Sequence, residues 1–433
     1  MKNILTIAGS DSGGGAGIQA DIKTITLLGG YAMSVITALT AQNSLGVQDI
    51  QPIGPEFIEK QLDSVLSDIG ADSVKTGMLF DAPAISAVAY ALRKYEKKLL
   101  VVDPVMSAQK GNPLAMDEAF AALVKEIIPI SYVITPNLIE AEKLSQKNLK
   151  NNDNEIKEAA RIIHGLGARN VLIKGGHRQG AALDILYDGR DFYSFEKKRI
   201  NTQNTHGTGC TYSAAIATLL AQGHNLIDAV AKAKDFIHSA IQHSFPLGKG
   251  CGTTNPAALY LQEQERQHVL VSLQKGLLRL KSLDGIAHLV PEVQINFGFA
   301  LPYAETASDV AAFPGRIVRV KERVVAVECP CFGGSQHIAA VILAVMQQDP
   351  IQRAAINIKF SDDIIAWAIR LGWKVSSFDR TLEPDETQAR EGSTLEWGTE
   401  AALSQQGKIP DIIFDRGGQG KEPMIRLLGK DPD

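Results

Sequence analysis

Cysteine, long apolar runs and an excess of charge of either sign are all scarce or missing in this 433-residue chain. Four cysteines in so long a chain do not make a disulfide framework. No run of about 18 apolar residues occurs, and the N-terminal stretch reaches Gly9 and Asp11 too early for a secretory signal peptide. A formal net charge of −4 gives no indication of a nucleic-acid-binding surface. We therefore expect a cytoplasmic, reduced protein with no nucleic-acid or membrane partner.

The common nucleotide and metal signatures are missing too. The stretch "GSDSGGGAGIQ" (9–19) lacks the G-x-G-x-x-G spacing, and no G-x-x-x-x-G-K-[ST] occurs anywhere in the chain. Cys329 and Cys331 have no second Cys/His pair at zinc-ligand spacing. They are therefore either half of a metal site or, more simply, the end of a strand.

Two blocks of alternating strand and helix patterns follow one another along the chain. In the first, short β-branched runs alternate with amphipathic segments, which predicts right-handed βαβ units and a mainly parallel sheet. Residues 183–196 predict a hairpin, because two polar-alternating runs flank an Asp-Gly turn. The second block predicts a helix at about 268–281 and, among its strands, one long strand over 316–329. We expect an α/β protein with two domains, residues 1–262 and 268–433, joined by a polar linker.

Glycine and polar residues follow six predicted strands of the first block, at the point where each strand ends. Any one such group is an ordinary turn, but six together predict a binding site, since ligands of open α/β sheets lie outside the carboxyl ends of the strands. The groups are Gly9 with Asp11, glycines 13–15 and Asp21; Gln42 with Asn43; residues 75–78; residues 103–106; residues 135–137 with Glu140; and residues 174–177.

The stretch "THGTGCTYSAA" (205–215) predicts a glycine loop that opens a helix, and N–H groups at such a helix start attract anions. Cys210 would lie at the mouth of this helix. Two interpretations stay open for it. The helix dipole would lower the pKa of the thiol, so that it could take a proton from an attacking hydroxyl group while the amides hold a phosphoryl group. Alternatively, Cys210 is a small buried hydrophobic residue that packs the helix.

Seven ordered motifs resemble the hydroxymethylpyrimidine/phosphomethylpyrimidine kinases of thiamine biosynthesis. The motifs cover residues 3–260 and are "TIAGSDSGGGAGIQADIKT", "SVITALTAQNS", "VKTGML", "VDPVM", "ITPNLIEAE", "LIKGGH" and "NTHGTGCTYSAAIA". The resemblance implies a ribokinase-like fold with helices on both faces of the sheet, and an enzyme that uses ATP and Mg²⁺. Ribokinase-like proteins are often dimers, so a homodimer is expected by analogy. The closest rival inside the fold is pyridoxal kinase.

The same resemblance assigns roles to individual residues. It places Cys210 at the position of the catalytic base, where most ribokinase-like enzymes have an aspartate. The remaining residues are implied as follows: Gln42 bonds the aminopyrimidine; Gly9, Met78 and Val105 line the ring pocket, with Asp21 in the same motif; Lys174 meets the ATP phosphates; Gly207, Thr208 and Gly209 form the anion hole; Asn137 and Glu140 organise Mg²⁺ through water.

The second block carries its own set of motifs. Arg316 and Arg319 lie near a strand start, and His337 lies in the first turn of a helix that opens at two glycines. With "PEVQINFGFALP", "AAINIKFS", "EGSTLEWGT" and "DRGGQGKEPMIRLLG", these residues resemble the thiamine-phosphate synthase domain of archaeal type. The resemblance implies that Arg316 and His337 are catalytic. Glu383, Glu386 and Asp415 are candidate Mg²⁺ ligands by chemical type alone.

Domains of this type also act as thiamine-phosphate sensors without catalysis. The function expected here is phosphorylation of 4-amino-5-hydroxymethyl-2-methylpyrimidine and its monophosphate, followed by condensation of the diphosphate with thiazole phosphate. The alternatives are a pyrimidine kinase with a sensing C-terminal domain, or a pyridoxal-type kinase.

Overall fold

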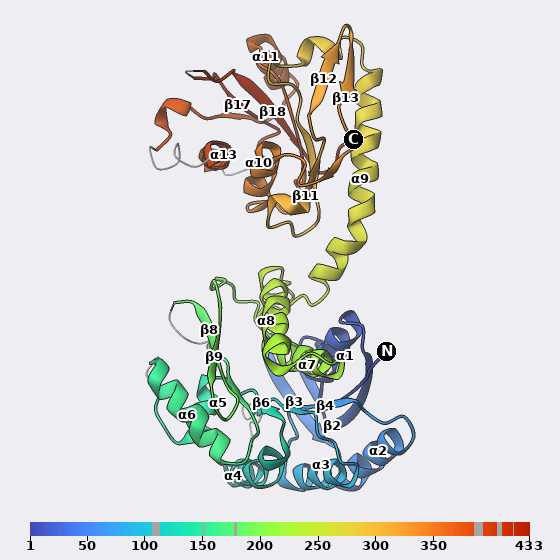
Figure 1. Cartoon of the computed structure of the whole chain (residues 1–433), viewed down its shortest axis with the longest axis vertical. Helices are drawn as coiled ribbons and strands as arrows, with labels where there is room; N and C mark the ends of the chain where they lie inside the picture. Colours follow the sequence, from blue (N-terminus) through green and yellow to red (C-terminus); the bar gives the residue numbers. More distant parts are fainter. Residues whose placement is uncertain (106–112, 150–151, 177–179, 385–392, 405–408, 419) are drawn as a thin grey trace. The chain divides into compact units, whose positions relative to one another are not determined.

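The computed structural model describes residues 1–105, 113–149, 152–176, 180–384, 393–404, 409–418 and 420–433. The chain divides into two compact units, Met1–Leu259 and Tyr260–Asp433 (Figure 1). Met106, His177 and Glu386, which belong to predicted site motifs, lie outside the described residues. Within the described residues, no helix combines the length and the apolar character that crossing a membrane requires.

The described part of the first unit contains one nine-stranded sheet in the order β3-β2-β1-β4-β5-β6-β7-β8-β9. The neighbours from β2 through β7 pair in parallel, and β3, β8 and β9 are antiparallel additions at the two edges. The mainly parallel sheet and the hairpin predicted at 183–196 are therefore confirmed. The strands are β1 (Asn3–Asp11), β2 (Tyr31–Asn43), β3 (Gly46–Pro52), β4 (Ser73–Thr76), β5 (Leu100–Val102), β6 (Val133–Ile134), β7 (Val171–Ile173), β8 (Ala182–Tyr187) and β9 (Phe192–Lys197).

Helices cover both faces of this sheet, as expected. Along β1, Leu5 and Ile7 pack into one hydrophobic cluster and Ile4 into another, because successive side chains of a strand point to opposite faces. The first cluster contains α2 (Pro55–Asp68), α3 (Ala82–Lys94), α5 (Leu138–Ser145) and α6 (Asp153–Gly165), and the second contains α1 (Gly17–Leu27), α7 (Thr208–Ala221) and α8 (Leu226–Gln242). Helix α4 (Pro113–Ala122) precedes a short π-helical turn, Leu123–Ile127. From Thr211 onward every residue of α7 is buried, so this helix is fixed firmly against the sheet.

One difference from the sequence expectation moves a site residue. Strand β2 (Tyr31–Asn43) includes Gln42, which was expected to follow the strand. It forms a hairpin with β3, whose residues are mostly exposed. A strand with no buried face has no apolar alternation, and for this reason no pattern in the sequence predicted β3.

The described part of the second unit contains a seven-stranded sheet in the order β14-β11-β10-β15-β18-β17-β16. All neighbours are antiparallel except β16 and β17. The strands are β10 (Phe297–Ala300), β11 (Val310–Ala312), β14 (Cys331–Phe332), β15 (Ala354–Lys359), β16 (Val375–Ser377), β17 (Ile412–Asp415) and β18 (Met424–Gly429). The helices are α9 (Ala258–Ser282), α10 (Gln336–Met346), α11 (Asp362–Arg370) and α13 (Ser393–Ser404).

Helices α9 and α10 lie on opposite faces of this second sheet (Figure 1). Phe297 and Phe299 of β10 pack against α9, whereas a Cβ at Gly298 would meet Ile338 and Ile342 of α10. The mixed strand and helix content confirms a second α/β region.

Two expectations for this region are wrong. Residues 316–329 are not one strand but a hairpin of β12 (Ile317–Val320) and β13 (Arg323–Ala326), which turns at Lys321 with φ +55°. The helix expected at 268–281 begins about ten residues earlier and runs through the polar stretch expected to be a linker.

Candidate active sites

A lysine and an aspartate that follow two strands of the sheet, on either side of β6, meet at the first turn of α7. Lys174 follows β7 and Asp103 follows β5, and the Lys174 Nζ lies 2.7 Å from the Asp103 Oδ1, with 12% and 2% of the side chains exposed. A Cβ at Gly209 would lie 3.1 Å from the Asp103 Oδ2 and 3.4 Å from the Lys174 Nζ. The charged pair therefore lies directly against the backbone of this turn, and glycine leaves room for it.

The backbone of the same turn is open to an anion. Gly207 is the N-cap with φ +82°, and a side chain there would run into the carbonyl oxygen of Gly15. The N–H of Thr208 donates to the Thr205 carbonyl at 3.2 Å. Among the described residues, the amides of Gly207 and Gly209 have no protein acceptor, so these two members of the predicted anion hole are available to a ligand.

Asn137 and Glu140 form the N-cap of α5 next to the charged pair. The Asn137 Oδ1 accepts from the Glu140 N–H at 2.9 Å, and the Glu140 Oε2 accepts from the Asn137 N–H at 2.8 Å, which is a capping box. Burial raises the pKa of Glu140 to about 7, against the opposing effect of Lys174 and with a further increase from Asp103. Both predicted Mg²⁺ residues therefore stand beside Asp103 and Lys174, with part of their hydrogen-bonding capacity used by the helix cap.

Asp21 forms an ion pair inside the protein rather than facing a pocket. Its Oδ2 lies 2.8 Å from the Lys75 Nζ, with both side chains 0% exposed, and also accepts from the Thr6 hydroxyl at 2.6 Å. Lys75 was part of a predicted strand end, but the sequence assigned it no role. Its charge acts on Cys210, because it lowers the pKa of that thiol. The available signal was a lysine placed inside a short predicted strand.

The residues expected to line the ring pocket lie together. A Cβ at Gly9 would come within 2.5 Å of the Met78 Cε, so the two residues are in contact across the sheet. Val105 lies two residues beyond Asp103, half-buried, and its N–H donates to the Asp103 carbonyl at 2.8 Å.

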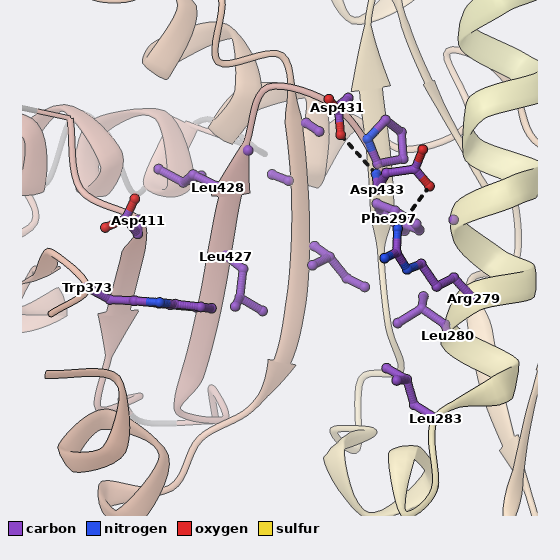
Figure 2. A pocket seen from close by; sticks show the side chains of 16 residues that line it. Arg279, Leu280, Leu283, Phe297, Trp373, Asp411, Leu427, Leu428, Asp431 and Asp433 are labelled. Carbon is purple, nitrogen blue, oxygen red and sulfur yellow. Dashed lines mark hydrogen bonds and ion pairs between the residues drawn. The ribbon is translucent and has the colours of Figure 1, made fainter. Parts of the chain in front are cut away.

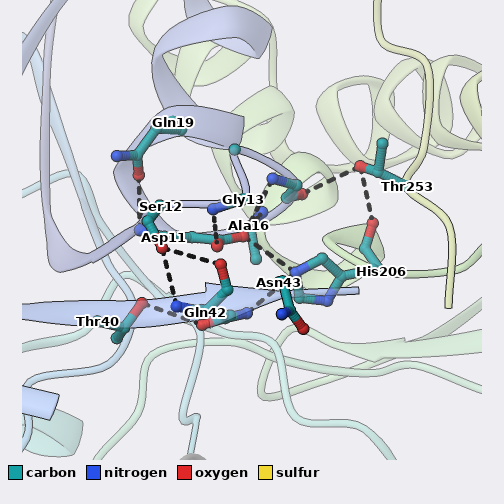
Figure 3. A network of polar contacts seen from close by, with 12 residues as sticks. Asp11, Ser12, Gly13, Ala16, Gln19, Thr40, Gln42, Asn43, His206 and Thr253 are labelled. Carbon is teal, nitrogen blue, oxygen red and sulfur yellow. Dashed lines mark hydrogen bonds and ion pairs between the residues drawn. The ribbon is translucent and has the colours of Figure 1, made fainter. Parts of the chain in front are cut away.

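Gln42 belongs to a polar network that the sequence did not predict (Figure 3). Its amide nitrogen lies 3.1 Å from the His206 Nε2, and the same ring nitrogen lies 3.0 Å from the Asp11 Oδ2. Asp11 also accepts backbone N–H groups of Gly13, Gly15 and Ala16 at 2.8–3.0 Å. One ring nitrogen cannot donate to Asp11 and accept from Gln42 at once. When His206 pairs with Asp11, the Gln42 amide nitrogen is therefore available to a ligand, while the Gln42 Oε1 accepts from the Thr40 hydroxyl at 3.2 Å.

In the second unit, Arg316 and His337 line one cavity of about 380 Å³ together with Asn296. All three also line an adjoining opening of about 900 Å³. Arg316 has φ +71°, and its guanidinium donates to the carbonyl oxygen of Val293. The structure thus brings together two residues that are 21 positions apart in sequence, and places His337 in the first turn of α10.

A separate cavity of about 570 Å³ lies beside α9 (Figure 2). It is lined mainly by apolar side chains, including Leu280, Phe297, Trp373 and Leu427, and Arg279 pairs with Asp433 at 3.5 Å at one end. None of the residues singled out from the sequence reaches it.

Comparison with known proteins assigns a family to each of the two units. The family described as phosphomethylpyrimidine kinase matches residues 11–255, and the family described as thiamine-phosphate synthase ThiN matches residues 272–433. The bifunctional thiamine biosynthesis protein ThiDN of Methanocaldococcus jannaschii is 34% identical over 432 residues, which are 99% of this chain and 95% of that protein. The chain belongs to this bifunctional family.

Other relatives match the kinase domain alone. The thiamine biosynthesis bifunctional protein ThiED of Geobacter sulfurreducens is 53% identical over 254 residues, 58% of this chain, and the match spans only 52% of that protein. The solved ADP complex of Bacillus subtilis pyridoxal kinase is 42% identical with a TM-score of 0.57, and covers 60% of this chain and 99% of that one. The ribokinase-like fold expected for the kinase domain is confirmed.

The kinase domain differs from expectation at Cys210. One of the two interpretations of Cys210 required a lowered pKa at the helix start, but burial raises the pKa of this thiol to about 11, with Lys75 opposing and Asp21 and Asp103 adding to the increase. Part of the residue is exposed, yet its thiol lies among buried charged groups. Desolvation therefore outweighs the helix dipole, and Cys210 carries its proton at neutral pH.

The ThiN domain does not offer Asp415 to a metal, contrary to expectation. The carboxylate is fully buried and holds Arg380 at 2.7 Å and Arg426 at 2.9 Å. Glu383 is buried as well. Within the described residues, no group of three or more His, Cys, Asp and Glu side chains is placed to hold a metal ion, and Cys329 and Cys331 are exposed thiols.

Proposed function

We propose that the kinase domain phosphorylates 4-amino-5-hydroxymethyl-2-methylpyrimidine and then its monophosphate with ATP, and that the ThiN domain joins the diphosphate to thiazole phosphate. The observation that carries the kinase part is the meeting of Lys174, Asp103 and Gly209 at the first turn of α7. Phosphoryl transfer depends mainly on positioning and charge stabilisation, and this turn supplies a cation and two free amides in one place.

Each kinase residue has a task in this account. Lys174 neutralises the phosphates of ATP, and the amides of Gly207 and Gly209 donate to the transferring phosphoryl group. Gln42 hydrogen-bonds the aminopyrimidine when His206 pairs with Asp11. Cys210 acts as the base in its thiolate form, which takes the proton of the attacking hydroxyl group and becomes the neutral thiol. Because burial raises the pKa of Cys210 to about 11, only a small fraction of the protein carries the thiolate at neutral pH.

Mg²⁺ fits the same corner of the domain. Asp103, Glu140 and the Asn137 amide offer oxygen atoms, which are the ligands that Mg²⁺ prefers, and two carboxylates are enough when phosphates and water complete the shell. When bound, the ion would neutralise charge on the transferring phosphates. A cation suits a site where burial and the nearby Asp103 raise the pKa of Glu140 to about 7 although Lys174 opposes them.

Two alternatives make different predictions. A pyridoxal-type kinase would turn over pyridoxal as fast as the pyrimidine, and the relatedness to the Bacillus subtilis pyridoxal kinase makes this comparison necessary. A sensing ThiN domain would bind thiamine phosphate without making it. Steady-state ADP release, measured with pyridoxal and with the pyrimidine, tests the first alternative. A kcat/KM for pyridoxal equal to that for the pyrimidine would overturn the proposed kinase substrate.

A further inference from the structure

One buried carboxylate in the ThiN domain orients two arginines. The Asp415 Oδ1 accepts from the Arg380 Nε at 2.7 Å, and its Oδ2 accepts from the Arg380 Nη2 at 3.2 Å and the Arg426 Nη1 at 2.9 Å. The Gly417 N–H donates to the Oδ1 at 2.9 Å as well. The side chains of Asp415, Arg426 and Arg380 are 0%, 5% and 11% exposed.

Two guanidinium groups and one carboxylate leave a surplus positive charge in this buried place. Each guanidinium has five N–H donors. Among the residues that the structure describes, Asp415 is the only hydrogen-bond acceptor for either side chain, which leaves the Arg380 Nη1 and the Arg426 Nε and Nη2 without a protein acceptor. The ring of Phe378 lies 5.6 Å and 5.5 Å from the two guanidinium carbons. A buried cation with unused donors costs free energy, and an anion that accepts from these donors would reduce that cost.

Arg380 and Arg426 line the cavity that holds Arg316 and His337, and Lys421 lines it too, so four cations surround it. Among the residues that the structure describes, the acidic residue that lines this cavity is Glu422, which accepts the N–H groups of Glu292 and Val293 at 3.0 Å and 3.2 Å. Asp415 is held by the two arginines, and Glu396 lines the adjoining opening. Cations are therefore in excess around the cavity.

We propose that Arg380 and Arg426, oriented by Asp415, bind a diphosphate group in this cavity. The proposal rests on the synthase function proposed above and names its anion subsite. In the reaction, the bond between the pyrimidine methylene carbon and the diphosphate oxygen breaks, the thiazole nitrogen forms a bond to that carbon, and pyrophosphate leaves with the electron pair. The guanidinium forks donate to the oxygens on which this charge develops. Two forks match the oxygens of a diphosphate better than those of a monophosphate.

Tryptophan fluorescence of the full chain reports on this subsite. All three tryptophans, Trp367, Trp373 and Trp397, belong to the second unit. The Trp397 ring lies edge-on to Phe378, with centroids 6.3 Å apart, and Phe378 contacts both arginines. Binding at the kinase site would leave this signal unchanged. Titration with inorganic pyrophosphate at fixed ionic strength is therefore the assay, with inorganic phosphate as the second arm.

We expect wild type to bind pyrophosphate more tightly than phosphate. Arg380→Gln and Arg426→Gln are each expected to weaken pyrophosphate binding at least about tenfold, as for a lost charged hydrogen bond. Arg319→Gln is the matched control, because Arg319 is exposed and pairs with Glu322 at 3.1 Å outside the cavity. Arg380→Lys keeps the charge without the fork and is expected to fall between wild type and Arg380→Gln. Denaturant unfolding followed by the same fluorescence identifies any variant that does not fold.

Unchanged pyrophosphate affinity in folded Arg380→Gln and Arg426→Gln overturns the subsite. If wild type makes thiamine phosphate, a KM for the pyrimidine diphosphate that is the same in these variants as in wild type overturns it as well. A wild type that binds pyrophosphate through these arginines but makes no thiamine phosphate supports the subsite and contradicts the synthase function. The two failures are therefore distinguishable.

Discussion

The Lys75 Nζ lies 2.8 Å from the Asp21 Oδ2, and neither side chain reaches solvent. A buried ion pair contributes little net stability, but removal of one partner leaves an uncompensated charge in the interior. The pair also stands behind the catalytic corner of the kinase domain, since Lys75 acts on the pKa of Cys210. Within this pair, Asp21 holds the positively charged Lys75 ammonium beneath the site.

Lys75→Met is expected to lower the free energy of unfolding of the kinase domain by about 3–5 kcal/mol. The double variant Asp21→Asn/Lys75→Met should recover a large part of this loss, because it removes both charges. Far-UV circular dichroism in denaturant measures the free energy of unfolding of each variant. The exposed pair of Lys94 and Asp63, 2.9 Å apart, is the control, and Lys94→Met should change the free energy of unfolding far less than Lys75→Met does, because solvent screens this pair. Equal effects of Lys75→Met and Lys94→Met would contradict this interpretation.

Gly209→Ala is expected to reduce kinase kcat/KM about 10- to 100-fold with little change in stability. The added methyl group would press on the Asp103 carboxylate and the Lys174 ammonium and displace both. Gly165→Ala is a matched control, because Gly165 ends helix α6 with nothing within 4 Å of its added Cβ. An active Gly209→Ala enzyme would show that the charged pair does not need its present position.

Cys210→Ala is expected to reduce phosphorylation about 100-fold or more and to leave thiamine phosphate synthesis intact. The pKa of about 11 lies above the assay range, so the reactive thiolate increases as pH rises. Between pH 7 and 9.5, wild-type kcat should increase with pH, and the profile of Cys210→Ala should be flat. A wild-type profile identical to that of Cys210→Ala would return Cys210 to a packing role.

The same pKa predicts a stability effect with a defined sign. Folding raises the pKa of Cys210 above its ordinary value, so the folded state binds more protons in the range between the two values. The stabilisation is fully present below the ordinary thiol pKa and is lost as pH rises toward 11. Kinase-domain unfolding should therefore become easier over this range in wild type, and less so in Cys210→Ala. An equal pH dependence in both proteins would contradict the raised pKa.

Arg316→Ala is expected to reduce thiamine phosphate synthesis about 100-fold while kinase activity stays unchanged, because the two residue sets belong to different units. Arg319→Ala, which removes an exposed arginine three residues away, should leave both activities intact. Product formation is followed by fluorescence after oxidation to thiochrome. A synthesis rate in Arg316→Ala equal to wild type would remove Arg316 from the site.

Parallel strands bring their carboxyl ends to one edge of the sheet, so the residues predicted to follow these strands had to meet there. This is how Asp103, Glu140 and Lys174, which follow β5, β6 and β7, came to lie near one another. What the sequence could not predict were the partners. The ion pair of Lys174 with Asp103 joins the ends of two strands that β6 separates, and the contact of Gln42 with His206 joins residues 164 positions apart.

In the ThiN domain the difficulty was greater, because β18 enters the sheet between strands that precede it. This arrangement places Arg426 next to Asp415, which pattern alone had suggested as a metal ligand. The interpretation of Cys210 as a thiol of lowered pKa failed for a reason unrelated to strand order. The helix dipole is visible in a sequence, but desolvation by the surrounding fold is not.

The most direct test of the account supplies wild-type full chain with the pyrimidine diphosphate, thiazole phosphate and Mg²⁺, without ATP, and follows thiamine phosphate by fluorescence after oxidation. The account predicts product that accumulates over many turnovers and disappears in Arg316→Ala. No product, together with tight binding of thiamine phosphate, would contradict it and would make the ThiN domain a sensor.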